Sequence, residues 1–180
     1  RHFDPLCWQN DKDRKYDIIL ANPPFSGSIK KEVILEDINL NTTSTELLFV
    51  KYMADHLAPE GKAAIVVPEG LLFGSTGAHL KLRKMLIEDF NILGVIGMPA
   101  GIFRPYSGVK TSIIVFSKTK PQKKIWFYEL QNDGFSIDEK RNPISENDIP
   151  DLLGKWNDKQ ETEKCWWIDI EELKKNPHFR

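Results

Sequence analysis

The chain has 180 residues, of which 41% are hydrophobic and 28% charged. These proportions are typical of a globular domain and exclude a disordered chain. The net charge of −1 gives no support to a general nucleic-acid-binding surface, although partner subunits can supply phosphate contacts. No apolar run approaches the ~20 residues that span a bilayer. Cys7 and Cys165 lie far apart and the histidines are scattered, so we expect no disulfide framework, no metal site and a cytoplasmic protein.

The first predicted element is a strand that ends in an unusual turn. Residues 16–21 (YDIILA) form an almost continuous apolar run, which is typical of a strand covered on both faces. Asn22, Pro23, Pro24 and Phe25 then end the strand abruptly. In open α/β sheets, ligands bind at this carboxyl edge of a strand. The turn is therefore a candidate site.

Four further strands are expected, because short apolar runs recur between turn residues. They cover residues 62–68, 91–99, 111–118 and 124–130. The last run alternates as an edge strand does. The short connection before it predicts that the last two strands are antiparallel.

Two helices are expected between these strands. Thr43 and Glu46 have the spacing of a capping box for the first helix, which runs to about residue 57. Residues 79–90 carry apolar side chains at helical spacing, and residues 70–77 before them are expected to form a glycine-containing loop. Strands separated by helices of this length predict βαβ units and a largely parallel sheet.

The chain after residue 130 is more polar. We expect Ser145 to cap a helix that ends near Trp156, and Asp169 to cap a helix after a short strand at Cys165. No glycine-rich turn of a nucleotide-binding sheet precedes residue 16. The sequence is therefore expected to begin in the middle of a fold.

The Asn-Pro-Pro-Phe turn offers two rigid hydrogen-bond acceptors and an aromatic face. Asn22 precedes a proline and is held extended, and the carbonyl of Pro23 is rigidly directed by the fixed φ angle of that residue. Pro24 stiffens the turn, and Phe25 provides a flat ring. This set suits a planar group that bears an NH₂, such as adenine, whose nitrogen lone pair becomes available when two acceptors hold its hydrogens. A rigid loop without a ligand is the alternative interpretation.

The sequence around this turn resembles a known family. The stretch DIILANPPF is similar to the fourth motif of S-adenosylmethionine-dependent adenine-N-6 DNA methyltransferases. The likeness continues through TELLFVKYMADHLAPEGKAAIVVPEGLLFG, GMPAGIFRPYSGVKTSIIVFSK and DGFSIDEKRNPISENDIPDLL. Together, from about residue 16 to 157, these segments resemble the modification (M) subunit of type I restriction–modification systems.

The resemblance implies roles for individual residues. Asn22 and Pro23 would accept hydrogen bonds from the target amino group beside the cofactor, and Phe25 would stack on the base. Phe103 would be a second aromatic contact to the flipped adenine. Asp4 would match the acidic residue that binds the adenine amino group of the cofactor.

Other residues near these positions have both functional and structural interpretations. Arg104 and Lys110 are candidates for contacts to DNA phosphates, with solvated loop charges as the alternative. The alternative interpretation of Phe103 is that it is a residue of the hydrophobic core. Trp166 and Trp167 are interpreted as packing residues.

The resemblance also implies a fold, a reaction and partners. The expected fold class is α/β, a Rossmann-like S-adenosylmethionine-dependent methyltransferase sheet, present as its C-terminal half from the catalytic strand onward. Residues 1–130 would belong to the methyltransferase domain and residues 131–180 to a polar C-terminal extension with short helices. The expected reaction is site-specific methylation of the adenine amino group in double-stranded DNA, with the base flipped out of the duplex. A specificity subunit is the expected protein partner, and a restriction subunit is a further candidate.

Two alternatives remain open at this point. A protein glutamine methyltransferase would present a similar NH₂ to the turn, but those enzymes usually carry Tyr at the position of Phe25 and lack the GVKTSI and DEKRNPI stretches. A non-catalytic structural or DNA-clamping piece of a larger assembly is the second alternative. Because the glycine-rich cofactor motif has no counterpart here, the isolated chain is expected to be inactive.

Overall fold

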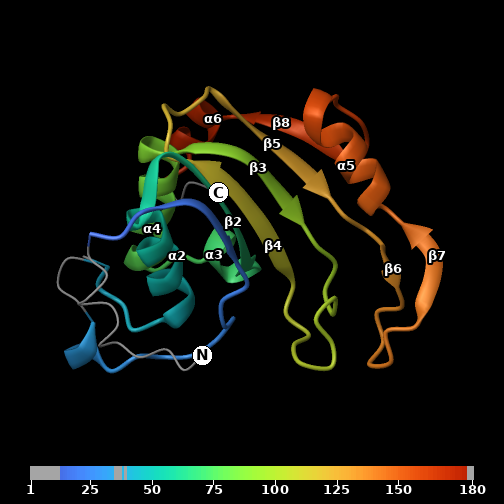
Figure 1. The fold of residues 1–180 in the computed structure, drawn as a ribbon, viewed down its shortest axis with the longest axis horizontal. Helices are drawn as coiled ribbons and strands as arrows, with labels where there is room; N and C mark the ends of the chain where they lie inside the picture. Colours follow the sequence, from blue (N-terminus) through green and yellow to red (C-terminus); the bar gives the residue numbers. More distant parts are fainter. Residues whose placement is uncertain (1–12, 35–37, 39, 178–180) are drawn as a thin grey trace.

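The computed structural model describes residues 13–34, 38 and 40–177, which form one six-stranded mixed sheet with flanking helices (Figure 1). The strand order is β1-β2-β4-β3-β5-β8. These strands are β1 (Tyr16–Ala21), β2 (Leu57–Pro68), β3 (Asn91–Gly97), β4 (Thr111–Ser117), β5 (Lys124–Glu129) and β8 (Cys165–Asp169). A separate hairpin pairs β6 (Asp133–Phe135) with β7 (Pro143–Asn147).

Four of the six strands run in one direction. β1 is parallel to β2, β3 is parallel to β5, and both β2 and β3 are antiparallel to β4. The sheet is therefore mixed: four strands share one direction, but three of the five neighbouring pairs are antiparallel, so the prediction of a largely parallel sheet was right for strand direction and wrong for strand pairing. β4 and β5 run in opposite directions as expected, but they are not neighbours, because β3 lies between them.

β5 is not an edge strand, so that prediction was wrong. β8 pairs with it on the side away from β3. Trp126 and Tyr128 on one face and Ile125 on the other are fully or almost fully buried. The alternation in this strand separates two buried faces and not a buried face from a solvated one.

Helices cover the two faces of the sheet unequally. One face carries α2 (Thr45–Asp55), α3 (Glu69–Phe73), α4 (Gly77–Asp89) and α6 (Ile170–Lys175), whose apolar side chains share one core cluster with the strands. The other face carries α5 (Ile149–Asp158), which packs Leu152 and Trp156 against a second cluster. A short 3-10 helix, η1 (Lys31–Val33), precedes α2. In Figure 1, α2 and α4 lie together at the left and α5 lies at the upper right.

Several predicted local features differ from the structure. The capping box of Thr43 and Glu46 is wrong, because the residue preceding α2 is Ser44, whose side chain makes no capping bond. Ser145 lies in β7 and caps no helix; its segment pairs with β6 instead. Part of the expected loop at residues 70–77 is the short helix α3. The cap at Asp169 is confirmed, since its side chain accepts a hydrogen bond from the backbone of Glu171 at 2.8 Å.

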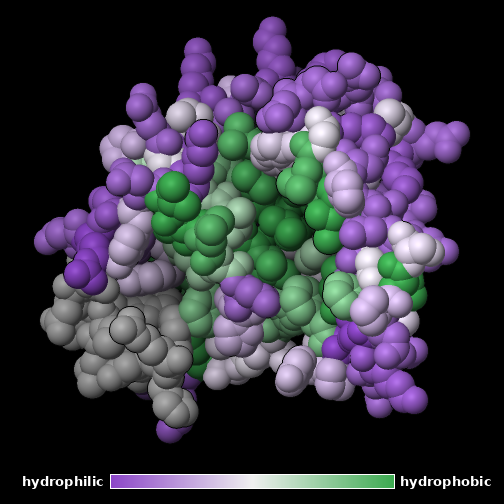
Figure 2. Space-filling model, turned by 45° about the vertical axis from the view of Figure 1, so that its right-hand side comes forward, coloured by the Kyte–Doolittle hydropathy of each residue, from purple (hydrophilic) through white to green (hydrophobic). Residues whose placement is uncertain are grey.

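β1 is covered on one face only, which corrects the prediction of a strand buried on both. Ile19 and Ala21 pack against the helix-side core cluster. Ile18 and Leu20, which point to the opposite face, are 70% and 79% exposed. Figure 2 shows an apolar hollow on one face of the molecule with hydrophilic residues along both sides.

Candidate functional site

The Asn-Pro-Pro-Phe turn lies at the edge of the sheet where the parallel strands end. β1 ends at Ala21, β2 at Pro68 and β3 at Gly97, and β4 begins at this same edge because it runs in the opposite direction. In Figure 1 the arrowheads of β3 and β5 point to this edge, and the loop of residues 98–110 extends beyond it. The turn thus occupies the edge at which open α/β sheets bind ligands.

The two predicted acceptors of the turn are available. Asn22 and Pro24 are exposed, Pro23 is buried and Phe25 is half-buried. Within the described part of the chain, neither the side chain of Asn22 nor the carbonyl of Pro23 takes part in a hydrogen bond. The exposed carboxamide of Asn22 is therefore free to accept a hydrogen bond from a ligand, and the carbonyl of the buried Pro23 has no partner among the described residues.

The chain that follows Phe25 is tied to the start of α2. The carbonyl of Gly27 accepts a hydrogen bond from the backbone of Thr45 at 3.2 Å, and Ile29 donates one to Thr43 at 2.9 Å. Gly27 has a φ of +142°, and a Cβ atom there would lie 3.0 Å from Oγ1 of Thr45. Glycine is needed for this backbone and this close approach. The turn is thus held at both ends, by β1 and by α2.

The structure brings the two predicted aromatic residues together. The rings of Phe25 and Phe103 meet edge to face, with centroids 5.2 Å apart and an angle of 61° between their planes. Phe103 also packs against the core cluster on the α5 side of the sheet. Both rings are half-buried, so each keeps accessible surface at the sheet edge. Such a pair stabilises the folded state by ~0.5–1.5 kcal/mol in addition to the stabilisation from the apolar area it buries.

The loop of residues 98–110 is a series of tight turns. Arg104 donates a backbone hydrogen bond to Gly101 at 3.0 Å, and Tyr106 and Ser107 both donate to the carbonyl of Phe103, at 2.9 and 3.0 Å. Gly101 has a φ of +86°, which favours glycine. Phe103 therefore sits at the centre of a compact loop.

The two basic residues of this loop have different surroundings. Nζ of Lys110 lies 3.4 Å from Glu69 and 3.6 Å from Glu129. Burial alone lowers the pKa of Lys110, but the charges of Glu129 and Glu69 outweigh it and raise that pKa. Arg104 is exposed, and no carboxylate of the described residues forms an ion pair with it. Arg104 is thus the basic side chain of this loop with an unneutralised charge.

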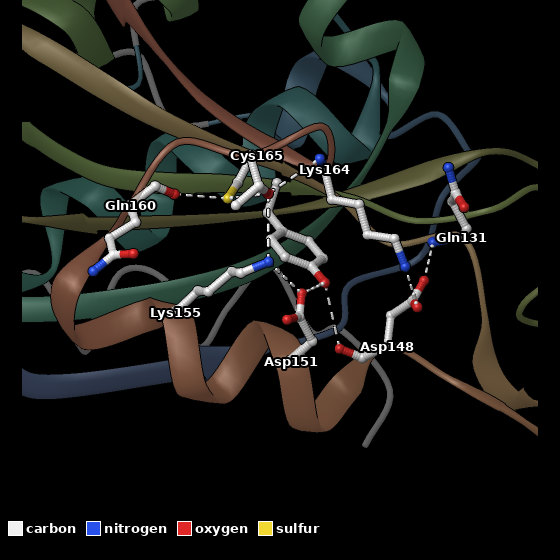
Figure 3. A network of polar contacts seen from close by, with 9 residues as sticks. Gln131, Asp148, Asp151, Lys155, Gln160, Lys164 and Cys165 are labelled. Atoms are coloured by element: carbon white, nitrogen blue, oxygen red, sulfur yellow. Dashed lines mark hydrogen bonds and ion pairs between the residues drawn. The ribbon is translucent and has the colours of Figure 1, made fainter.

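A polar network fixes α5 against the sheet (Figure 3). Tyr128 donates a hydrogen bond to Asp151 at 2.7 Å, and Lys155 donates another to the same carboxylate at 3.0 Å. Asp148 accepts hydrogen bonds from the backbone of Gln131 at 2.9 Å and from Nζ of Lys164 at 2.6 Å. The network joins β5, the start of β8 and α5.

The same contacts shift the ionisation of three side chains. Burial, followed by the hydrogen bond to Asp151, raises the pKa of Tyr128. The hydrogen bonds from Tyr128 and Lys155 lower the pKa of Asp151. Burial opposes ionisation of Asp148, but its hydrogen bonds outweigh that effect and lower its pKa. At neutral pH the network therefore contains two ionised aspartates and a neutral tyrosine.

A cavity of about 280 Å³ lies on the helix-rich face of the sheet. Its walls include Leu86, Ile114 and Phe127, which belong to the core cluster on the helix-rich face, whereas Phe103 packs on the opposite face. Neither Phe25 nor Phe103 lines the cavity, but Glu69, Lys110 and Glu129 do, so it adjoins the ion pairs at the base of the loop of residues 98–110. Among the residues that the structure describes, no cluster of His, Cys, Asp or Glu is arranged to hold a metal ion, and no helix is long and apolar enough to cross a membrane.

Some residues of the site were missed from the sequence, and one lies outside the structure. Glu69 and Glu129 were missed because each comes from a different strand end and has no motif around it. Asp4 lies outside the described residues. Trp166 stacks on Phe127, with centroids 6.0 Å apart, which agrees with the packing role expected for it.

Comparison with known proteins supports this description. Residues 1–179 match the N-6 DNA Methylase family. The chain is 33% identical over 173 residues to the EcoEI methylase subunit of a type I restriction enzyme from Escherichia coli, a match that covers 89% of this chain and 34% of that protein. It is 31% identical over 144 residues to the StySJI methylase subunit from Salmonella typhimurium, covering 75% of this chain and 26% of that protein.

Solved structures show the same relationship. A structure that describes complex assembly of the type I restriction–modification system superposes with a TM-score of 0.80 at 32% identity, covering 94% of this chain and 37% of that one. The EcoKI M protein superposes with a TM-score of 0.66 at 26% identity, covering 81% of this chain and 31% of that one. The chain thus spans about a third of the length of these relatives. Because the family match extends over almost the whole sequence, the chain belongs to the N-6 DNA methylase family.

Proposed function

We propose that this chain is the catalytic part of an adenine-N-6 DNA methyltransferase that works within a type I restriction–modification complex. The observation that carries the proposal is the contact between Phe25 and Phe103, beside the free acceptors of Asn22 and Pro23. This pair of aromatic residues comes from two loops that are distant in sequence. It stands at the edge of the sheet where a ligand is expected.

The turn has a direct role in the proposed reaction. The side-chain oxygen of Asn22 and the carbonyl of Pro23 accept the two hydrogens of the adenine amino group. That geometry would favour a tetrahedral nitrogen with its lone pair directed at the activated methyl group of the donor, while Phe25 would hold the ring. Methyl transfer would break the carbon–sulfur bond of the donor, and the nitrogen would then lose one proton to solvent. Pro24 keeps the acceptors in place, so little reorganisation is needed when charge develops.

S-adenosylmethionine is the proposed methyl donor, and when bound it supplies a methyl group activated by a positively charged sulfur. Asn22, Pro23 and Asp4 are the residues of this chain proposed to contact it. The exposed, unpaired carboxamide of Asn22 fits that role, but no glycine-rich turn for the cofactor is present in the sequence. We propose that sequence outside these 180 residues supplies it and covers Ile18 and Leu20. The isolated chain should then bind the donor weakly and transfer no methyl group; micromolar affinity in calorimetry would contradict this.

The two aromatic residues fit a base that leaves the duplex. Extruding a base costs a few kcal/mol, and stacking on aromatic side chains returns ~1–3 kcal/mol per base. Because the two rings touch each other, a base that enters between them must separate them. The prolines hold Phe25, so the loop with Phe103 is the part expected to yield. Arg104 then contacts a neighbouring phosphate, and a specificity subunit supplies sequence recognition.

The test is product analysis with the complete protein in its complex. Duplex DNA that contains the target site is incubated with donor, digested and examined by mass spectrometry for N6-methyladenine. A glutamine-containing peptide serves as the competing substrate. Methyl transfer to the peptide and not to DNA would support a protein methyltransferase, and transfer to neither would support a non-catalytic role.

A further inference from the structure

The hairpin of β6 and β7 touches the loop that carries Phe103. A Cβ atom placed on Gly101 would lie 2.9 Å from Cγ2 of Ile137, so the side chain of Ile137 rests directly on the backbone of Gly101. Gly101 is buried although its loop projects from the sheet edge. A residue from the C-terminal part of the chain thus closes over the base of this loop.

Hydrogen bonds hold Ile137 in this position. The backbone of Ser136 donates to the carbonyl of Asn142 at 2.8 Å, and Asp138 accepts backbone hydrogen bonds from Lys140 and Arg141 at 2.8 and 3.1 Å. Arg141 also donates to the carbonyl of Ser136 at 3.0 Å and forms an ion pair with Asp133. The turn between β6 and β7 is therefore internally tied, and it presents Ile137 at a defined place.

Gly101 is confined from two directions. The same added Cβ atom would lie 3.2 Å from Nε of Arg104, and the carbonyl of Gly101 accepts the backbone hydrogen bond of Arg104. Phe103 lies between these two residues in sequence. A shift of Gly101 into the space held by Ile137 would therefore displace the turn that carries Phe103 and disturb its contact with Phe25.

We propose that Ile137 is a positioning residue, which holds the loop of residues 98–110 in the arrangement where Phe103 meets Phe25. The β6–β7 hairpin then limits how far the loop is displaced when a target base separates the rings, so that Phe103 stays close enough to stack on the base. Because the role of Phe103 in base capture is itself proposed, the inference rests on the proposed function. Ile137 acts through its contact with Gly101.

The chain offers a matched control in the same hairpin. Ile144 on β7 is 39% exposed and Ile137 is 42% exposed, and Ile144 is not among the atoms nearest to Gly101. Ile137→Ala and Ile144→Ala remove the same atoms from surfaces of similar exposure. A general loss of hairpin stability would affect both variants equally.

The experiment uses the complete protein and two measurements. The first is hydrogen–deuterium exchange of residues 98–110 without DNA, in which we expect Ile137→Ala to exchange faster and Ile144→Ala to match the parent. The second is the fluorescence of 2-aminopurine at the target position together with turnover. We expect Ile137→Ala to lower the flipped fraction and kcat by roughly three- to tenfold, with KM for DNA unchanged, and Ile137→Val to restore most of the loss.

The outcomes separate this inference from the proposed function. Equal exchange in the two alanine variants would overturn the positioning role, whatever the enzyme does. Faster exchange with unchanged fluorescence and kcat would overturn the link from the hairpin to base capture. If the parent protein itself neither flips the base nor methylates it, the proposed function fails, while faster exchange in Ile137→Ala still shows that the hairpin holds the loop.

Discussion

The turn of residues 22–28 and the loop of residues 98–110 lie at the same sheet edge and each contributes one aromatic ring. They are built in different ways. The turn is rigid by its own composition, because two prolines fix the backbone around Phe25. The loop depends on other segments, since Ile137 rests on Gly101 and Lys110 pairs with Glu69 and Glu129.

This difference indicates a division of tasks. A group that must be placed accurately for chemistry is built into a stiff local segment. A group that must yield when the base enters is held by contacts that can be adjusted, from elements that are distant in sequence. Substitutions in the turn should therefore damage the reaction, and substitutions in the loop and its supports should damage base capture.

The largest effect is expected for Asn22→Ala in the complete protein. Removing one of two preorganised acceptors should lower the rate of methyl transfer by ~10²–10³-fold, with little change in DNA affinity. Single-turnover kinetics measures the first quantity and fluorescence anisotropy the second. Asn157→Ala, at an exposed position on α5, is the control. A rate within a few-fold of the parent would remove Asn22 from the catalytic role.

The next largest effect concerns the two rings. Loss of one stacking partner corresponds to ~1–3 kcal/mol, or roughly a five- to hundredfold lower flipped fraction. Phe103→Ala should mainly reduce base flipping, whereas Phe25→Ala should reduce both base flipping and the rate of methyl transfer. The measurement is 2-aminopurine fluorescence beside turnover, with the exposed Phe73→Ala as control. Unchanged fluorescence and turnover in Phe103→Ala would return that residue to a packing role.

A smaller effect is expected where α5 is fastened to the sheet. The lowered pKa of Asp148 means that its ionised form stabilises the fold above the unfolded pKa of about 3.8 and that this contribution is lost as the pH falls through the folded pKa. Asp148→Asn should lower the free energy of unfolding at pH 7 by ~1–3 kcal/mol. Below about pH 4, the free energy of unfolding should fall less steeply with pH in this variant than in the parent. Urea unfolding across this range measures both. If Asp158→Asn, at an exposed position, changed the free energy of unfolding by the same amount, the ionised carboxylate of Asp148 would not be what stabilises the contact of α5 with the sheet.

The smallest effect separates the two basic residues of the loop. Arg104→Gln should lower the slope of log affinity against log salt concentration by about 1, as expected for one lost phosphate contact. Lys110→Gln should leave this slope unchanged, because its charge already faces Glu69 and Glu129. Titration of DNA at several salt concentrations provides the slopes. If Lys110 and not Arg104 changes the slope, the assignment of the phosphate contact must be reversed.

The sequence predicted the elements that depend on nearby residues. The strand that leads into Asn22 and the cap at Asp169 follow from local patterns, and both are present in the structure. The predictions that failed concern which elements become neighbours. The pattern of β5 alone gives no information on the pairing with β8, and Ser145 has a helix-capping residue type but is drawn into the hairpin with β6.

The sequence by itself determined the turn at Asn22 and its chemistry, because proline restricts the backbone locally and the acceptors are adjacent in the chain. Only the tertiary structure decided that Phe103 meets Phe25, that Lys110 is paired with Glu69 and Glu129, and that Ile137 closes over Gly101. Those contacts join strand ends and loops that are far apart in sequence. The position of β4 between β2 and β3 places Lys110 beside the ends of neighbouring strands, an arrangement set by the packing of the whole sheet and not by any single segment.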